Sequence, residues 1–239
     1  MNVFLSPHLS SLPTNQPRQL QLVVVHTTTM AIKRFPPVES ADEHGLIAIG
    51  GDLEPESVIL AYQSGIFPWP LDQDSLAWFA PPERAVIFLD EFHVSRRLRR
   101  TLSRDIFTTK RDGDFRNVIL RCAEITNRGD QEGTWITNEI INAYTKLHTM
   151  GYTHSFESYH EGELVGGLYG IQIGRFFAAE SSFFRMPDAS KVAMCAMVEY
   201  LRSQNISWFD CQVLTPFSEG FGAREISRSD YMRLLASVL

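Results

Sequence analysis

Three consecutive segments of alternating apolar and polar residues dominate the second half of the chain and limit the folds it can adopt. These segments cover residues 153–159, 163–173 and 175–183. The residues between the first two, Glu161-Gly162-Glu163, are typical of a hairpin turn. Segments this short and this closely connected pair as an antiparallel meander. A three-stranded antiparallel unit is therefore the first element that the sequence predicts.

Helical periodicity surrounds this meander. The predicted helices cover residues 114–126, 138–149 and 189–204, and a last helix follows Ser227. Another strand, from Trp208 to Leu214, separates the last two helices. The order is helix, helix, three strands, helix, strand and helix, which predicts an α+β fold with a mostly antiparallel central sheet.

The N-terminal third has the pattern of a smaller, separate unit. Residues 45–51, GLIAIGG, predict a short apolar segment and a glycine turn, and the helix that follows ends at Ser64. Residues 67–82 are so rich in proline that we expect no regular structure there, and we place a domain junction near residue 83. The extension before Met30 is either a disordered arm or an artefact of a start codon placed too early. The predicted parts are a loose extension over 1–29, a small N-terminal domain over 30–83 and a larger domain over 84–239.

Composition and charge exclude several classes of protein. With 44% hydrophobic and 21% charged residues, the chain has enough apolar residues for a globular core. Its longest aliphatic run, Leu22 to Val25, is far too short to cross a bilayer, so we expect no membrane segment. The net charge of -6 argues against a protein that coats nucleic acid with its whole surface. The cysteines, Cys122, Cys195 and Cys211, form no disulfide pattern and fit a reducing cytoplasm.

A local concentration of basic residues contrasts with the acidic average. Seven of the 22 basic residues lie between positions 96 and 111: Arg96, Arg97, Arg99, Arg100, Arg104, Lys110 and Arg111. A patch of this kind can bind phosphates on an otherwise acidic protein. It can equally be the solvated face of a helix. The residues alone leave both interpretations open.

Three polar residues interrupt segments that otherwise look like buried strands. In the strand WFDCQVL, alternation places Asp210 and Gln212 on one face and Cys211 on the other. Glu180 follows the apolar run FFAA in the meander. Burying an acid or an amide costs free energy unless the group is hydrogen-bonded. The three residues therefore indicate either a catalytic cleft or a buried structural network.

Longer stretches of the sequence are similar to one enzyme family. The matching segments are GLIAIGGDL (45–53), AYQSGIFPW (61–69), EGTWIT (132–137), AYTKLHTMGYTHSFE (143–157), ELVGGLYG (163–170), FFAAESSFFRMPDASK (176–191) and FDCQVL (209–214). In these segments the chain resembles the leucyl/phenylalanyl-tRNA protein transferases, and the resemblance extends over about residues 45–224. It implies a small N-terminal domain followed by a catalytic acyltransferase domain of the GNAT type.

The resemblance also implies a reaction. Enzymes of this family move leucine or phenylalanine from its charged tRNA to the N-terminal lysine or arginine of an acceptor protein, and so mark that protein for N-degron degradation. Because the aminoacyl ester is already activated, we expect no cofactor and no metal. By resemblance Asp210 and Gln212 form a catalytic relay, in which Asp210 fixes the Gln212 amide and the amide oxygen accepts a hydrogen bond from the attacking amine. Glu180 is expected beside that amine, where its carboxylate suits a cationic acceptor residue. The final acceptor of the amine proton stays open.

Further residues acquire roles through the same resemblance. Trp69 and Trp135 match positions that hold the 3′-terminal adenosine of the tRNA by stacking. The apolar pocket for the leucyl or phenylalanyl side chain corresponds to Leu168, Phe177, Met194 and Met197. Methionine is a possible secondary donor, because apolar pockets discriminate weakly between similar side chains. Without the resemblance, the spacing of these residues would indicate an ordinary core. The expected contacts with the acceptor stem of the tRNA are Arg96, Arg97, Arg99 and Arg100.

Three other interpretations are weaker. A GNAT enzyme that uses acetyl-CoA needs a loop of the form Arg/Gln-x-x-Gly-x-Gly/Ala, and residues 217–222 have the glycines without the leading Arg or Gln. A non-catalytic RNA-binding module would not require the three polar strand residues. A zinc site is suggested only by His154 and His160, which have no further ligands at suitable spacing. We also expect the protein to be a monomer.

Overall fold

The computed structural model describes residues 24–25, 31–71, 75–125, 127–128, 131–132 and 134–239. Most of the predicted extension over residues 1–29 therefore lies outside the described residues, and only strand β1, Val24–Val25, belongs to it. The other strands are β2 Leu46–Gly50, β3 Phe67–Pro70, β4 Leu76–Phe79, β5 Glu83–Phe88, β6 Thr108–Arg111, β7 Asn127–Arg128, β8 Gln131–Glu132, β9 Thr153–His160, β10 Glu163–Ile173, β11 Phe176–Phe184, β12 Trp208–Gln212 and β13 Arg224–Ser227. The helices are α1 Pro55–Gln63, α2 Arg96–Ser103, α3 Phe115–Ala123, α4 Asn138–Thr149, α5 Ala189–Ser203, α6 Pro216–Glu219 and α7 Arg228–Ala236, with a short 3-10 helix at Val38–Ser40.

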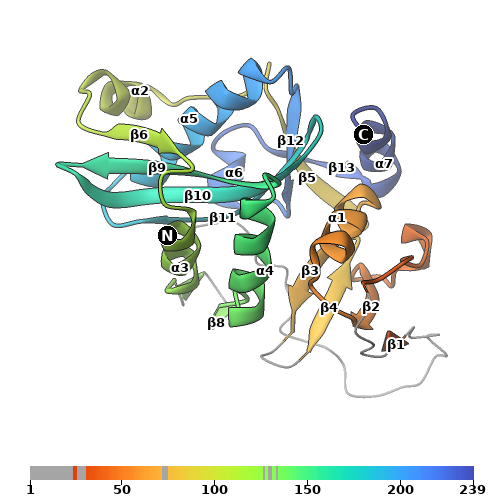
Figure 1. The fold of residues 1–239 in the computed structure, drawn as a ribbon. Coiled ribbons are helices and arrows are strands. Elements are labelled where there is room, and N and C mark those ends of the chain that lie inside the picture. The colour runs from red at the N-terminus through yellow and green to blue at the C-terminus, as the bar shows by residue number, and fades with distance from the viewer. Residues whose placement is uncertain (1–23, 26–30, 72–74, 126, 129–130, 133) are drawn as a thin grey trace.

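A seven-stranded sheet forms the centre of the molecule. Its strand order is β13-β5-β12-β11-β10-β9-β6, and every neighbouring pair is antiparallel except β11 and β12, which are parallel. Helices α3 and α4 cover one face of this sheet, and α5 covers the other (Figure 1). The predicted mixture of helices and mostly antiparallel strands is therefore confirmed. The three strands of the predicted meander are β9, β10 and β11.

Helix α4 begins where the sequence offers a cap. The Thr137 hydroxyl accepts a hydrogen bond from the main-chain N–H of Ile140 at the start of α4. Along α4, the residues predicted to share a face, among them Tyr144 and Leu147, are buried against the sheet. The longest helix, α5, has 15 residues, whereas about 20 apolar residues are needed to cross a bilayer. Within the described ranges, no helix has both the length and the apolar character for such a crossing.

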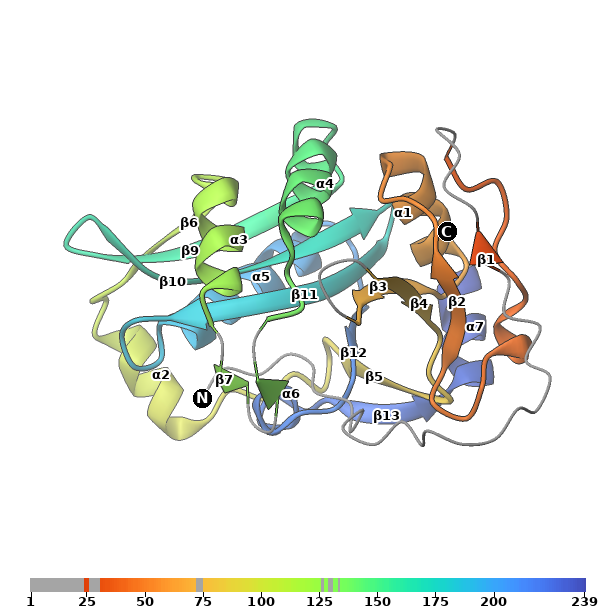
Figure 2. The same cartoon turned by 90° about the horizontal axis from the view of Figure 1, so that it is seen from below.

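A four-stranded sheet in the order β1-β2-β4-β3 lies beside α1 at one end of the molecule (Figure 2). It corrects one prediction, because residues 67–82 contain the antiparallel pair β3 and β4 where we expected irregular chain. Strand β3 is an edge strand that pairs with β4 alone. Pro68 and Pro70 therefore interrupt no second ladder of hydrogen bonds, and the edge tolerates them. Strands β5 and β6 were not predicted either.

The larger of two clusters of buried side chains extends across the predicted junction near residue 83. It contains Phe67, Trp69 and Phe79 from the smaller sheet together with the apolar side chains of the seven-stranded sheet. The smaller cluster lies within the N-terminal part and includes Ile47 and Trp78. The two sheets therefore share apolar burial, which holds them against each other.

Gly166 in β10 is required by a close approach rather than by a turn. A Cβ atom at this position would lie 2.5 Å from the Ala189 side chain and 2.8 Å from its main chain, at the start of α5. We expect Gly166→Ala to lower the free energy of unfolding by about 1–3 kcal/mol, because the helix must move away from the sheet. Gly220→Ala is the control, since a Cβ there meets only ordinary contacts at 3.4 Å. Urea unfolding measures both, and equal stabilities of the two variants would contradict the prediction.

Candidate active site

Glu180 and Gln212 face each other where two neighbouring strands separate. Strands β11 and β12 share a single registered pair, Ala178 with Asp210. Glu180 is an extra residue in β11, because Tyr169 pairs with Ser181 while the next residue of β10 pairs with Ala179. A bulge of this kind bends a strand and redirects the side chain at the bulge.

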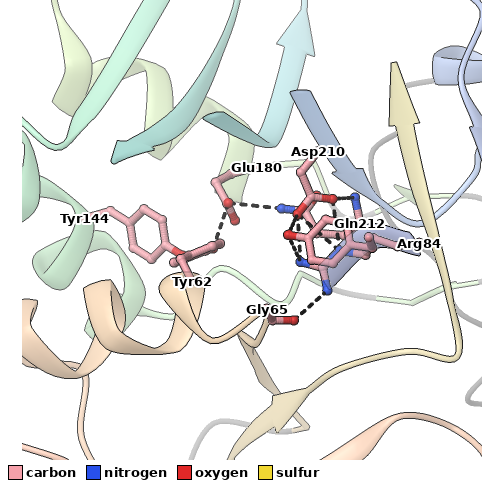
Figure 3. Close-up of polar contacts among 8 residues, drawn as sticks. Tyr62, Gly65, Arg84, Tyr144, Glu180, Asp210 and Gln212 are labelled. Atoms are coloured by element: carbon pink, nitrogen blue, oxygen red, sulfur yellow. Dashed lines mark hydrogen bonds and ion pairs between the residues drawn. The ribbon is translucent and has the colours of Figure 1, made fainter. Parts of the chain in front are cut away.

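Strand β12 carries a second bulge next to the first. Asp210 pairs with Val86 of β5, but Gln212 pairs with the adjacent Ala85, so Cys211 is the extra residue. The predicted convergence of Asp210 and Gln212 is correct, since both belong to one buried cluster, although the strand between them is not regular. The two bulges together aim side chains from β11 and β12 at the same point (Figure 3).

The hydrogen bonds of Gln212 differ from the predicted relay. Its side-chain Nε2 donates to Glu180 Oε1 at 3.1 Å, while its main-chain N–H donates to Asp210 Oδ1 at 2.8 Å. Asp210 therefore holds the main chain of Gln212, and Glu180 holds its amide. The amide oxygen, Oε1, is buried and has no hydrogen-bond partner in the part of the chain that the structure describes. A buried acceptor without a partner is unusual and marks a place where a donor can bind.

Arg84, on β5, forms a buried ion pair with Asp210. Its Nη2 lies 2.7 Å from Asp210 Oδ2, and its Nε lies 3.0 Å and 3.1 Å from the two carboxylate oxygens. The Tyr231 hydroxyl donates a further hydrogen bond of 2.9 Å to Oδ2. Burial is the largest single influence on the pKa of Arg84 and lowers it, but the attraction and hydrogen bonds of Asp210, together with Tyr231 and Tyr62, raise that pKa above its ordinary value. Each charge is thus compensated inside the protein.

Two tyrosine hydroxyls complete the cluster on the side of Glu180. Tyr62, from α1, donates to Glu180 Oε1 at 2.7 Å, and its hydroxyl lies 2.7 Å from that of Tyr144 on α4. Burial raises the pKa of Glu180 from its ordinary value of 4.5 to about 8, although the hydrogen bond from Tyr62 acts in the opposite direction. Burial also raises the pKa of both tyrosines, which therefore stay neutral donors. At neutral pH the protonated form of Glu180 is present in a large fraction of molecules.

Sequence reasoning missed Arg84, Tyr62, Tyr144 and Tyr231 as members of the site. An arginine directly before the apolar run AVIF (85–88) is a signal that could have indicated a buried ion pair. It was overlooked because the predicted domain junction fell beside it. The tyrosines gave no separate signal, since an aromatic residue on a buried helix face is ordinary core.

Trp69 and Trp135, the expected adenosine contacts, stack on each other. Their ring centroids are 4.9 Å apart with an angle of 19° between the planes, and both rings are buried. Trp69 also lines a cavity of about 200 Å³, together with Phe67, Phe79 and Val213. This cavity borders the polar cluster, because Phe67 packs on Arg84 and Val213 follows Gln212. The structure thus brings Trp69, and Trp135 stacked on it, close to the polar cluster.

The residues expected to form the apolar pocket are fully buried in the larger core. They are Leu168 in β10, Phe177 in β11, and Met194 and Met197 in α5. A second cavity, of about 420 Å³, lies between the N-terminal part and α4 and is lined by Glu54, Thr137 and Lys146 among others. Neither cavity is lined by the four expected residues. Their packing is that of a core, and space for a donor side chain requires them to move.

The arginines Arg96, Arg97, Arg99 and Arg100 lie on α2 and are exposed. Helix α2 and strand β6 lie at the end of the seven-stranded sheet that is farthest from the smaller sheet (Figure 1). Arg111 and Lys110 on β6 are also exposed, so all these basic side chains reach solvent. The patch is separate from the polar cluster, and the two could contact different parts of a long ligand.

The histidines considered for zinc have other partners. His154 Nδ1 lies 2.8 Å from Asp112, and His160 Nδ1 lies 2.9 Å from the Ile106 carbonyl oxygen. No group of three His, Cys, Asp or Glu side chains in the described part of the chain is arranged to hold a metal ion. The polar cluster instead offers a buried acceptor, two carboxyl groups and neutral hydroxyl donors. Such a set can orient an amine and stabilise charge during acyl transfer.

Comparison with known proteins identifies the family. Residues 86–236 match the sequence model of the leucyl/phenylalanyl-tRNA protein transferases, and residues 51–82 match that of their N-terminal domain. A leucyl/phenylalanyl-tRNA–protein transferase of Syntrophobacter fumaroxidans is 47% identical over 202 residues, which cover 84% of this chain and 86% of that protein. One of Flavobacterium johnsoniae is 46% identical over 203 residues, which cover 85% and 95%. The crystal structure of FemX, with a TM-score of 0.48 and 12% identity over 75% of this chain and 70% of that chain, is too distant to support an inference. By its sequence, the chain belongs to the leucyl/phenylalanyl-tRNA protein transferase family.

Proposed function

We propose that the protein transfers leucine or phenylalanine from aminoacyl-tRNA to the N-terminal lysine or arginine of acceptor proteins. Membership of the family makes it an aminoacyltransferase. The observation that carries the proposal to this site is the buried, unpartnered side-chain oxygen of Gln212, a residue that Asp210 holds by its main chain and Glu180 by its Nε2. This oxygen can accept a hydrogen bond from the N–H of an attacking amine.

The reaction needs positioning more than it needs chemical activation. The amine nitrogen forms a bond to the ester carbonyl carbon, and the bond from that carbon to the ribose oxygen breaks. One proton leaves the amine, and the departing ribose oxygen takes one up, so the transfer is balanced without ATP. Holding a neutral amine against the ester turns a reaction between two colliding molecules into a reaction within one complex. The translational and rotational entropy that is lost on binding then no longer adds to the activation barrier, of which it is a large part.

Gln212 suits the role of an orienting acceptor. Since Glu180 accepts from Nε2, the amide is held with its oxygen turned away from Glu180 and available to the amine. An amide oxygen is too weakly basic to keep the proton. It therefore orients the amine, so that the lone pair of the nitrogen faces the ester carbonyl, and does not become protonated itself. Asp210 keeps the main chain of Gln212 in place. Glu180, which accepts a hydrogen bond from Tyr62, would face the cationic acceptor residue.

The donor would bind on the aromatic and apolar side of the same site. Trp69 lines the cavity of about 200 Å³, so a base that enters this cavity can stack on that indole, with Trp135 supporting it from behind. The leucyl or phenylalanyl side chain would then occupy space that Leu168, Phe177, Met194 and Met197 fill in the free protein. Methionine would be accepted as a secondary donor, because it is unbranched and adaptable.

The finer assignments belong to the same proposal. We infer a small N-terminal domain over 30–83 and a GNAT-like catalytic domain over 84–239, supported by the separate sheets, although one core joins them. Acceptors that receive leucine or phenylalanine would be marked for N-degron degradation. The protein would act as a monomer in the cytoplasm, where charged tRNA is made.

A transfer assay tests the proposed function directly. The protein is incubated with tRNA charged with Leu, Phe, Met or Arg and with reporter proteins that begin with Lys, Arg, Asp or Ala. We expect mass increases of leucine or phenylalanine on the Lys and Arg reporters, a weaker one of methionine, and none from Arg-tRNA. Acetylation from acetyl-CoA without any tRNA-dependent product would overturn the proposal.

The basic patch on α2 predicts how binding depends on salt. If Arg99 and Arg100 contact phosphates, reversing both charges to Glu should reduce the slope of log affinity for charged tRNA against log salt by about 1 to 2. The control is the same double reversal at Arg116 and Arg175, which are exposed outside the patch. It changes the net charge equally and should leave the slope nearly unaltered. Equal slopes for both double variants would place the tRNA elsewhere.

The raised pKa of Glu180 predicts a pH dependence of stability. Between its ordinary pKa of 4.5 and its folded value of about 8, the folded protein keeps a proton that the unfolded chain releases. The contribution of Glu180 to stability is therefore present below about pH 4.5 and is lost as the pH rises through about 8. Glu180→Gln should flatten the fall of the melting temperature over this range, whereas Glu163→Gln, at an exposed position, should not. If the melting temperature falls equally with pH in the unaltered protein and in both variants, position 180 does not carry a buried acid.

A further inference from the structure

We propose that Arg84 is a positioning residue for the transfer reaction, which holds the Asp210 side chain in place and thereby fixes the main chain at Gln212. The inference rests on the proposed function, because it assigns Arg84 to the same site. Four observations lead to it: the geometry of the ion pair, the groups that hold Arg84, the backbone conformation of Gln212 and the charges around the cluster.

The ion pair has the geometry of a fixed, two-pronged contact. Nε and Nη2 of Arg84 reach both carboxylate oxygens of Asp210 at 2.7–3.1 Å. The exposed fractions are 2% for Arg84 and 0% for Asp210, so water does not screen the pair. A buried carboxylate depends on close, well-directed contacts to compensate for its lost hydration. Arg84 therefore holds the side chain of Asp210 in one orientation.

Arg84 is itself held from three directions. Its Nη1 donates to the Gly65 carbonyl oxygen at 3.1 Å, in the turn after α1. Its guanidinium lies 4.5 Å from the ring centroids of Phe67 on one side and Tyr231 on the other. A guanidinium between two rings and a carbonyl has little freedom to rotate, since each contact depends on its planar shape. The position of Asp210 is thus set by groups in β3, β5 and α7.

Asp210 transmits this position to Gln212 through the main chain. Gln212 has a φ of +56°, a left-handed backbone conformation that residues other than glycine rarely adopt. The hydrogen bond of 2.8 Å from its N–H to Asp210 Oδ1 compensates for part of that cost. An ionised carboxylate accepts such a bond more strongly than a neutral acid does. Ionised Asp210 therefore keeps Gln212 turned so that Nε2 meets Glu180 and Oε1 stays free.

The charges around the cluster make Arg84 the balancing group. Glu180 on β11 is the second carboxyl group, and its negative form repels that of Asp210. Tyr62 on α1 and Tyr231 on α7 are neutral donors. Cys211 is a buried thiol whose pKa burial raises, so it adds no charge. Without Arg84, the groups named here offer Asp210 only hydrogen bonds and a like charge.

Two substitutions separate the charge of Arg84 from its shape. Arg84→Met removes both, and Arg84→Lys keeps the charge but loses the two-pronged contact. Arg202→Met is the matched control, because Arg202 donates to the Leu89 carbonyl oxygen outside the site. Single-turnover transfer of leucine is measured per folded molecule over a range from about pH 5 to 9 for each protein. Affinity for charged tRNA and melting temperature are measured on the same preparations.

We expect Arg84→Met to lower the rate of transfer about a hundredfold or more with little change in affinity for charged tRNA, because Asp210 then no longer holds the main chain of Gln212 in place. Arg84→Lys should lower the rate about tenfold or more, because the charge remains but the two-pronged contact is lost. The control should match the unaltered protein in both properties. A structural role alone would lower the melting temperature and leave the rate profile in place. That result would overturn the inference.

A second readout does not depend on transfer. Infrared difference spectra between each protein and its Asp210→Asn counterpart report the hydrogen bonding of the Asp210 side chain. We expect the band of this group to move when Arg84 is replaced by Met, because the two-pronged contact is lost. If Arg84→Met does not fold, Tyr231→Phe removes one donor to Asp210 and should lower the rate by a smaller amount. If the unaltered protein transfers nothing, the proposed function fails, while an Asp210 band unaffected by loss of Arg84 overturns the inference itself.

Discussion

The buried ion pair of Arg84 and Asp210 is the constraint on which the rest of the site depends. Removing two charges from water costs several kcal/mol for each ion, and only close, well-directed contacts return that cost. Here the contacts come from parts of the chain that are distant in sequence: the turn after α1, strand β5, strand β12 and helix α7. The smaller sheet and the seven-stranded sheet must therefore keep one relative position for the charges to remain satisfied. Loss of either partner would leave an uncompensated charge in the core.

Much of the fold was predictable because periodicity reports directly on burial. The meander β9-β10-β11 and helices α3, α4 and α5 follow patterns of period two or 3.6. Strands β3 and β4 were not predictable in this way, because the rule that proline excludes strands applies to strands with two neighbours and β3 has one. The order of the seven strands depends on contacts between residues far apart in sequence, such as Trp208 with Phe88, and local patterns contain no such information.

The sequence predicted which polar residues belong to the site better than it predicted the hydrogen bonds between them. Asp210, Gln212 and Glu180 were recognisable because each is a polar residue in an apolar strand, and a buried polar group needs a partner. Their hydrogen bonds were assigned from the family resemblance, which placed Asp210 on the side-chain amide of Gln212, whereas in the structure Glu180 holds that amide and Asp210 holds the main chain. The bulges at Glu180 and Cys211 also break the regular alternation that the sequence analysis assumed. A bulge depends on how two strands pair, and no single residue type predicts it. The positive φ of Gln212 has the same origin.

The stacked pair of Trp69 and Trp135 has an optical consequence. Two indole rings 4.9 Å apart and nearly parallel do not absorb independently, because their transition dipoles couple through space. With only four tryptophans in the chain, this coupled pair should contribute visibly to the ultraviolet circular dichroism of the native protein. The signal depends on the separation and angle of the rings and therefore disappears when anything moves them apart. The protein thus carries an intrinsic chromophore pair at the place where its substrate is expected, and no attached label is needed to follow it.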